Sequence, residues 1–174
     1  SDTDGSMNQS AGNGASVILS NSTNETSDIT IGIDVSKFQG TIDWAQVASS
    51  GVDFAMIRVG YRAQKTGVIY ADTNAKYNMQ QAAANGIKVG VYFFSSAVND
   101  AEAIEEADWV ADFIADYNIT YPVAFDCEGF NTSESRQKSM TKAERTAVAA
   151  TFLQEIYDKG YTPMFYAASS ELSN

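Results

Sequence analysis

Histidine is absent from this chain of 174 residues, and cysteine occurs only once, at Cys127. A Ser-His-Asp triad and a Cys-His dyad both need an imidazole base, so neither can operate here. A single cysteine without histidine also cannot supply a Cys/His zinc site or an internal disulfide. Any acid–base chemistry must therefore come from carboxylates, tyrosines or lysines.

Basic residues are scarce as well, with 11 Lys and Arg against 22 Asp and Glu, for a net charge of −11. Phosphate binding depends on clustered cations, so this balance argues against a nucleic-acid partner. Residues 1–28 hold four acids and residues 100–116 hold seven, neither with a basic residue, and these two segments account for the whole charge. The second segment is interpreted as the solvated face of a helix.

Long apolar runs are also missing. The longest are strand-length, such as the run from Val89 to Phe94, and fall well short of the roughly 18 residues that a membrane-spanning helix needs. We therefore expect no membrane insertion.

The composition divides the chain into two parts. Residues 1–28 are rich in Ser, Asn, Thr and Gly and are predicted to be a flexible linker, because one short apolar patch at residues 17–19 offsets little ordering entropy. Residues 29–174 are predicted to be a single folded domain, in which short β-rich runs alternate with helical segments that end at Gly. The predicted strands are Thr30–Val35, Phe54–Gly60, Lys88–Phe94, Pro122–Phe125 and Met164–Ala167. The predicted helices are Asp43–Ser50, Asp72–Asn85, Asp100–Tyr117 and Thr141–Lys159.

This alternation predicts an α/β fold with a parallel sheet, and two architectures fit it. Five β/α units form more than half of an eight-stranded, TIM-like β/α barrel, whose remaining strands would come from a companion segment or a second chain. A flavodoxin-like open sheet of five strands would need no further residues.

Three carboxylates follow predicted strands, at the edge where active sites of parallel sheets form. Asp34 ends the first strand, and Asp126 and Glu128 end the fourth. Residues two apart on a strand share one face, with Cα atoms about 6.6 Å apart at roughly 3.3 Å per residue. Mutual repulsion would raise the pKa of one carboxyl, leaving a proton donor beside an ionised partner. Cleavage of a glycosidic bond needs this pair of states.

A structural interpretation competes with this one, because strand-end Asp residues often cap loops or pair with a nearby Arg, for which Arg58 is available. Cys127 points to the opposite face of the fourth strand and is expected to be a small core residue, not a nucleophile.

Four motifs together resemble glycoside hydrolase family 25, the N-acetylmuramidases, and follow one another in order from about residue 30 to 168. They are Gly32-Ile-Asp-Val-Ser-Lys-Phe-Gln-Gly-Thr-Ile-Asp-Trp44, Phe54-Ala-Met-Ile-Arg-Val-Gly-Tyr61, Val89-Gly-Val-Tyr-Phe-Phe-Ser95 and Pro122-Val-Ala-Phe-Asp-Cys-Glu128.

The resemblance implies a modified β/α barrel that hydrolyses the β-1,4 bond between N-acetylmuramic acid and N-acetylglucosamine in peptidoglycan, without a metal or organic cofactor. By position, Glu128 matches the general acid/base. Asp126 matches the partner that attacks the sugar or steers the substrate's acetamido oxygen, and Asp34 matches a supporting acid. Tyr61, Tyr92 and Tyr166 lie at or near strand ends, as the family's site aromatics do. The last three strands of the family have no counterpart here.

Other functions stay open at this point: a chitin-type glycosidase, a non-catalytic glycan-binding barrel, and a divalent-metal site formed by the three carboxylates. Family likeness predicts a protein that is secreted or associated with the cell wall, with peptidoglycan glycan strands as its partner.

Overall fold

The structure is a computed structural model that describes residues 9–11, 15–21 and 29–166. Its centre is a sheet of five parallel strands, in which each strand lies next to the one that precedes it along the chain. These strands are β3 (Ile29–Val35), β4 (Phe54–Arg62), β6 (Lys88–Phe94), β7 (Val123–Asp126) and β8 (Pro163–Tyr166). The five predicted strands are thus confirmed to within two residues, except that Ala167 lies outside the described residues.

Four helices connect these strands, as predicted: α1 (Trp44–Ser49), α2 (Ala75–Ala84), α3 (Asp100–Ile114) and α4 (Lys142–Asp158). The Asp43 side chain caps α1, and Thr141 and Glu144 form a capping box at the start of α4. Helix α2 begins three residues later than predicted, after Asn74, because the carboxylate of Asp72 has other partners.

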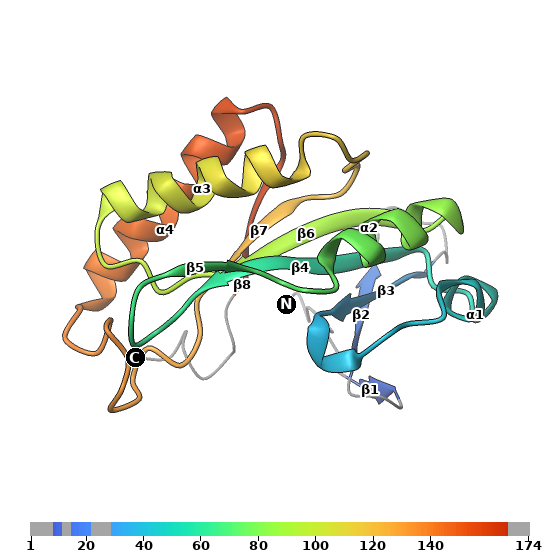
Figure 1. Cartoon of the computed structure of the whole chain (residues 1–174), viewed down its shortest axis with the longest axis horizontal. Helices are drawn as coiled ribbons and strands as arrows, with labels where there is room; N and C mark the ends of the chain where they lie inside the picture. The colour runs from blue at the N-terminus through green and yellow to red at the C-terminus, as the bar shows by residue number, and fades with distance from the viewer. Residues whose placement is uncertain (1–8, 12–14, 22–28, 167–174) are drawn as a thin grey trace.

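All four helices lie on the same face of the sheet. One large core cluster joins residues from α1, α2, α3 and α4 to alternate residues of β3, β4, β6 and β7. Among the described residues, the opposite face carries a small cluster around Phe54, Met56 and Ala124 that includes no helix residue. Figure 1 shows α3 and α4 packed together along one side of the sheet.

Sequential strand order with helices on one face distinguishes the two architectures. A doubly wound open sheet reverses its strand order and places helices on both faces. A β/α barrel instead keeps its strands in sequential order and places all of its helices on the outer face. The five strands therefore form a curled half-barrel, and the prediction of a TIM-like β/α barrel is confirmed in place of the flavodoxin-like alternative.

Three strands were not predicted from the sequence. Strand β5 (Ile69–Ala71) folds back antiparallel onto the end of β4. Strands β1 (Gln9–Ala11) and β2 (Ala15–Asn21) fall within the segment predicted to be a linker, and β2 pairs antiparallel with β3. The other residues of this predicted linker, 1–8, 12–14 and 22–28, lie outside the described part of the chain. The domain boundary at residue 29 therefore stays a prediction.

Helix α3 is less uniformly solvated than its acidic sequence indicates. Ala103 lies in the core, whereas Ile104 is 40% exposed. Glu106 was assigned to the solvated face but is fully buried. Residues 103, 107, 110 and 114 share one helical stripe, and Glu106 lies beside it, where Arg62 and Ser95 meet its carboxylate.

None of the helices that the structure describes is both long and apolar enough to cross a bilayer.

Candidate active site

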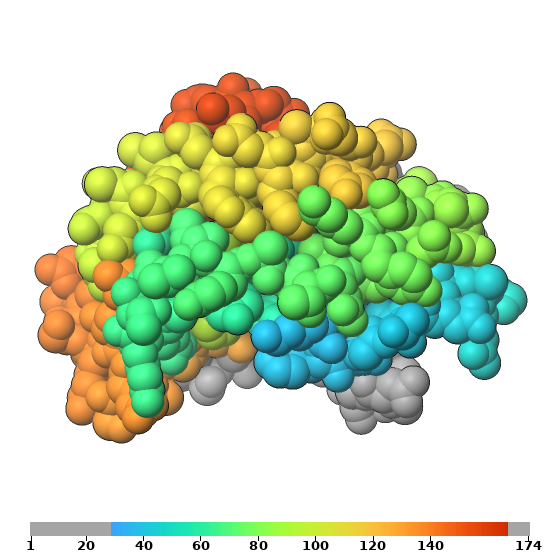
Figure 2. Space-filling model, in the orientation of Figure 1, coloured from blue at the N-terminus to red at the C-terminus, as the bar shows by residue number. Residues whose placement is uncertain are grey.

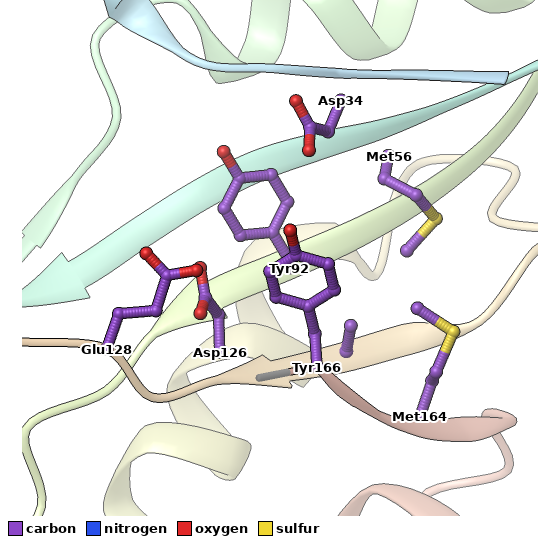
Figure 3. Close-up of a pocket in the computed structure, with 8 residues that line it drawn as sticks. Asp34, Met56, Tyr92, Asp126, Glu128, Met164 and Tyr166 are labelled. Carbon is purple, nitrogen blue, oxygen red and sulfur yellow. The ribbon is translucent and has the colours of Figure 1, made fainter. Parts of the chain in front are cut away.

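A pocket of about 290 Å³ opens on the concave face of the half-barrel (Figure 3). Every one of the five parallel strands, or the loop directly after it, contributes to its wall. The lining residues are Asp34, Met56, Tyr92, Ala124, Asp126, Glu128, Met164 and Tyr166. The predicted acids and two of the predicted tyrosines are therefore brought together.

Strand register places these side chains on one face. Asp34 pairs with Met56, Tyr92 pairs with Ala124, and Asp126 pairs with Tyr166 on neighbouring strands. Because side chains alternate across a strand, residues in register point to the same face. Polar side chains gather towards one end of this face and the methionines towards the other (Figure 3).

The part of the pocket floor that Met56 forms depends on the absence of a side chain at Gly90. A Cβ atom there would lie 2.5 Å from the Met56 sulfur and 2.8 Å from the Pro122 carbonyl oxygen. The absence of this atom lets Met56 lie across β6 and form part of the pocket floor.

Asp126 and Glu128 enter the pocket from one short segment. Asp126 is the last residue of β7 and is 6% exposed, whereas Glu128 lies in the loop beyond the strand and is half-buried. The sequence placed both acids on one strand, but β7 ends at Asp126, and Glu128 reaches the same pocket from the loop. Gly129, with φ of +66°, then turns the chain away in a conformation that favours glycine.

Neighbouring elements hold the backbone of both acids. The Ser95 N–H donates to the Asp126 carbonyl at 2.7 Å, and the Gln64 side-chain amide donates to the Glu128 carbonyl at 3.1 Å. The Gln64 carbonyl in turn accepts from the Arg136 N–H at 3.2 Å. These bonds fix the segment that carries the two acids against β6 and the loop after β4.

Tyr92 stays protonated in this environment. Burial raises its pKa well above the usual value, the negative charges of Asp34 and Asp126 add to that effect, and the positive charge of Arg58 opposes it. The phenol hydroxyl is therefore a hydrogen-bond donor over the physiological pH range. Tyr166 faces the same pocket from β8.

Tyr61 is placed differently from the other two tyrosines, since it is not among the lining residues of this pocket. Its ring stacks on Tyr70 with centroids 5.6 Å apart and lies 4.9 Å from the Arg58 guanidinium. Strand β4 has a bulge where its register with β6 shifts between Arg58 and Gly60, and Tyr61 pairs with Phe94, on the face that carries Tyr92. Arg58 and Tyr61 therefore face the same side although they are three residues apart.

Arg58 was considered as a partner for a strand-end Asp, and its ion pair in the structure is with Asp72, at 2.9 Å. Asp72 also accepts hydrogen bonds from the backbone N–H groups of Lys37 and Asn74, at 3.0 and 2.9 Å. One buried carboxylate thus joins β4, the turn after β3 and the start of α2. The sequence analysis missed this role because an Asp before a helix also resembles an ordinary cap.

Cys127 is buried in the main core cluster on the helix side of the sheet, as predicted, and its thiol lies 3.6 Å from the Gln137 side-chain oxygen. Within the described residues, no three His, Cys, Asp or Glu side chains are grouped in a way that could hold a metal ion.

This arrangement suits chemistry on a sugar. Three carboxyl groups face a pocket that also presents tyrosine rings and hydroxyl groups, which can stack on and hydrogen-bond a pyranose. Glycosidases work with two carboxyl groups, one as acid and one as base or nucleophile. An acid and its partner can both come from the segment Asp126–Glu128.

Comparison with known proteins agrees with this assignment. The sequence model of glycosyl hydrolases family 25 matches residues 33–174. Lysozyme M1 from Streptomyces globisporus is 32% identical over 117 residues, which are 60% of this chain and 38% of that protein.

Two solved structures have a similar fold. The lysozyme from Streptomyces coelicolor is 26% identical, with a TM-score of 0.60 over 80% of this chain and 63% of its own. The modular autolysin LytC from Streptococcus pneumoniae is 24% identical, with a TM-score of 0.72 over 82% of this chain and 33% of its own.

The chain spans less than two thirds of the length of each of these relatives. Nevertheless, the family match covers well over half of the chain and includes all three carboxylates of the pocket. The chain therefore belongs to glycosyl hydrolases family 25.

Proposed function

We propose that this chain is the catalytic part of a peptidoglycan hydrolase that cleaves the β-1,4 bond between N-acetylmuramic acid and N-acetylglucosamine. The observation that carries this proposal is the convergence of Asp34, Asp126 and Glu128 on one pocket with Tyr92 and Tyr166. Family membership and the lysozymes among the relatives support the same reaction class.

In the proposed mechanism, Glu128 is the general acid. It is only half-buried and lies beyond the strand end, where it can reach the bridging oxygen of a bound glycan. It donates its proton to this oxygen as the bond to the anomeric carbon breaks, and then accepts a proton from the water that completes hydrolysis.

Asp126 is the ionised partner in this mechanism. It either attacks the anomeric carbon or orients the acetamido oxygen of the substrate for that attack. Its burial and the hydrogen bond to its backbone carbonyl restrict its position, which favours reaction in a fixed geometry. Asp34, on the opposite wall, stabilises the positive charge that develops on the sugar ring. The Tyr92 hydroxyl donates a hydrogen bond to the bound sugar.

We also propose that the protein acts on the cell wall as a secreted or wall-associated enzyme. In the described part of the chain, β8 ends the sheet, so a companion segment or second chain could pair with its outer edge and extend the barrel.

The test is release of reducing sugar from purified peptidoglycan. The unaltered chain is compared with Glu128→Gln and Asp126→Asn, and Glu134→Gln serves as a control because this exposed carboxyl pairs with Lys65 at the surface. We expect the unaltered chain to cleave peptidoglycan, with a rate that a chelator does not change. The rate should fall at least 100-fold in Glu128→Gln and Asp126→Asn and stay the same in Glu134→Gln.

Cleavage of chitin but not peptidoglycan would favour a chitin-type glycosidase instead. Binding of peptidoglycan without any turnover would indicate a glycan-binding barrel, and loss of activity with chelator would indicate a metal-dependent reaction.

A further inference from the structure

A cluster of aromatic and basic side chains lies beside the pocket and takes no part in the chemistry described above. It consists of Lys37, Phe38, Arg58, Tyr61 and Tyr70, and is called the aromatic platform here. Phe38 is 75% exposed and Tyr70 is 47% exposed. Single exposed apolar residues are common on protein surfaces, but a connected group of rings points to a binding site.

The rings and cations of the platform contact one another. The Lys37 ammonium lies 5.5 Å from the centroid of the Phe38 ring and 5.2 Å from that of Tyr61. The Arg58 guanidinium lies 5.1 and 4.9 Å from the same two centroids. Figure 2 shows the turn after β3, in light blue, next to the β4 and β5 residues, in teal and green.

Phe38 is presented by a well-fixed turn. The Ser36 hydroxyl accepts from the Phe38 N–H at 3.3 Å, and the Gln39 side chain accepts from the Ser36 N–H at 2.6 Å. The Lys37 N–H is bound to buried Asp72. A turn with three such bonds holds an exposed ring in place before any ligand arrives, which reduces the entropy lost on binding.

The two cations of the platform differ in their pairing. Arg58 is buried and its charge is balanced by Asp72 at 2.9 Å. Lys37 forms no ion pair with the residues that the structure describes, and its ammonium is held over the two rings by cation–π attraction. Lys37 is thus the cation available to an anionic ligand.

The platform is continuous with the pocket. Arg58 pairs in register with Tyr92, whose pKa responds to the charge of Arg58, and Lys37 follows Asp34 by three residues. A glycan that occupies the pocket and extends past the Asp34 wall would meet Phe38 and Lys37 next. The pocket itself presents only acids as charged groups, so an anionic substituent of the glycan is favoured outside it, at Lys37.

We propose that the aromatic platform is a glycan subsite in which Phe38 stacks on a sugar ring and Lys37 binds a carboxylate carried by that glycan. The inference rests on the proposed function, since peptidoglycan offers such carboxylates on its peptide stem, or on the lactyl group of muramic acid where no stem is attached. It names the feature by which this chain would distinguish peptidoglycan from an uncharged glycan such as chitin.

The test is calorimetric binding to the chain carrying Glu128→Gln, which prevents turnover. The ligands are a peptidoglycan tetrasaccharide with free lactyl carboxylates, the same tetrasaccharide with peptide stems, and chitotetraose. Lys37→Met removes the charge but keeps the aliphatic stem. Lys76→Met is the matched control, because Lys76 of α2 lies 5.6 Å from the Phe113 ring of α3 in a similar cation–π pair.

We expect Lys37→Met to weaken binding of a carboxylate ligand about tenfold, as for loss of one charge-assisted hydrogen bond, and to leave chitotetraose binding unchanged. Loss with the stem-free ligand alone identifies the lactyl carboxylate, because the stem is attached through this carboxyl as an amide. Loss with the peptide-bearing ligand alone identifies a stem carboxylate, and loss with both shows that Lys37 binds either one. Phe38→Ala should weaken all three ligands, with an unchanged melting temperature because the ring is exposed.

The proposal is overturned if Lys37→Met matches Lys76→Met with every ligand, if Phe38→Ala binds normally, or if the chain binds none of the ligands. Failure of the proposed function gives a different result, namely no Glu128-dependent release of reducing sugar from peptidoglycan, whatever the binding pattern.

Discussion

The hydroxyl of Ser95 lies 2.7 and 2.8 Å from the two carboxylate oxygens of Glu106, a side chain with no solvent exposure. The N–H of the same serine donates to the carbonyl of Asp126. Arg62 approaches Glu106 from β4 at 3.5 Å and also binds Glu105 at 2.6 Å. A buried acid on α3 is therefore connected through one residue to the strand end that carries a predicted catalytic group.

Stability should depend on pH through Glu106. Burial raises the pKa of this carboxyl to about 7, although the Ser95 hydroxyl and Arg62 lower it, and nearby Glu102 raises it slightly. The folded state then binds more protons than the unfolded state between about pH 4.5 and 7. The contribution of Glu106 to stability is complete below pH 4.5 and is lost as the pH rises through 7.

We expect the unfolding free energy of the unaltered chain to fall relative to Glu106→Gln between pH 4.5 and 8, by a few kcal/mol at ~1.4 kcal/mol per pKa unit. Urea unfolding at several pH values measures this change. Glu105→Gln is the control, since this carboxyl also contacts Arg62 but is largely exposed. A difference between Glu106→Gln and the unaltered chain that does not vary with pH would contradict the prediction.

The position of Glu128 should depend on Gln64. The Gln64 amide donates to the Glu128 carbonyl, yet its side chain does not line the pocket. Gln64→Ala removes a hydrogen bond of about 1 kcal/mol from the loop that carries the proposed acid. We expect kcat on peptidoglycan to fall about fivefold with little change in KM, as for a residue that acts through its neighbour.

The matched control for this prediction is Lys65→Ala. Lys65 is the next residue, and its exposed ion pair with Glu134 at 2.9 Å contributes little. Kinetics and melting temperature are measured for both variants. Equal kcat values for the two would show that the bond to Glu128 has no effect on the reaction, and a large drop in melting temperature for Gln64→Ala would indicate a general loss of structure.

The strands and the three acids could be predicted because their signals are local. A run such as Val123–Asp126 is apolar up to the point where it ends in a carboxylate, and parallel strands place such ends at one edge. The pairing of Asp72 with Arg58 and the burial of Glu106 are set by partners 14 and 44 residues away along the chain. A local pattern cannot distinguish an Asp that caps a helix from one that binds an Arg.

Tyr61 illustrates the same limit at the site. Strict alternation along β4 would turn its side chain to the helix face, and the bulge turns it to the face that carries Arg58 and Tyr92 instead. One extra residue reverses the alternation of every side chain that follows it. The sequence contains no clear sign of this bulge apart from Gly60, which also fits an unbroken strand.

Gly60 lies at the bulge, where a side chain would clash with its neighbours. A Cβ atom there would lie 2.6 Å from the Trp109 ring and 2.7 Å from the Tyr70 carbonyl oxygen. The Trp109 ring cannot retreat easily, because it stacks on Phe113 with centroids 4.9 Å apart and is tilted against Phe93 at 5.7 Å. We expect Gly60→Ala to reduce the unfolding free energy by about 1–3 kcal/mol, the usual range for overpacking.

Urea denaturation of Gly60→Ala, Trp109→Phe and the double variant measures this clash as a coupling energy. Trp109→Phe removes the part of the ring nearest to Gly60, so the double variant should lose less unfolding free energy than the two single variants together. The Tyr70 carbonyl stays in place, so the double variant should still be less stable than Trp109→Phe alone. Strictly additive effects would mean that the ring does not contribute to the clash. A neutral Gly60→Ala would mean that the β4–β5 hairpin can move away from α3, and the bulge would then not hold Tyr61 firmly in place.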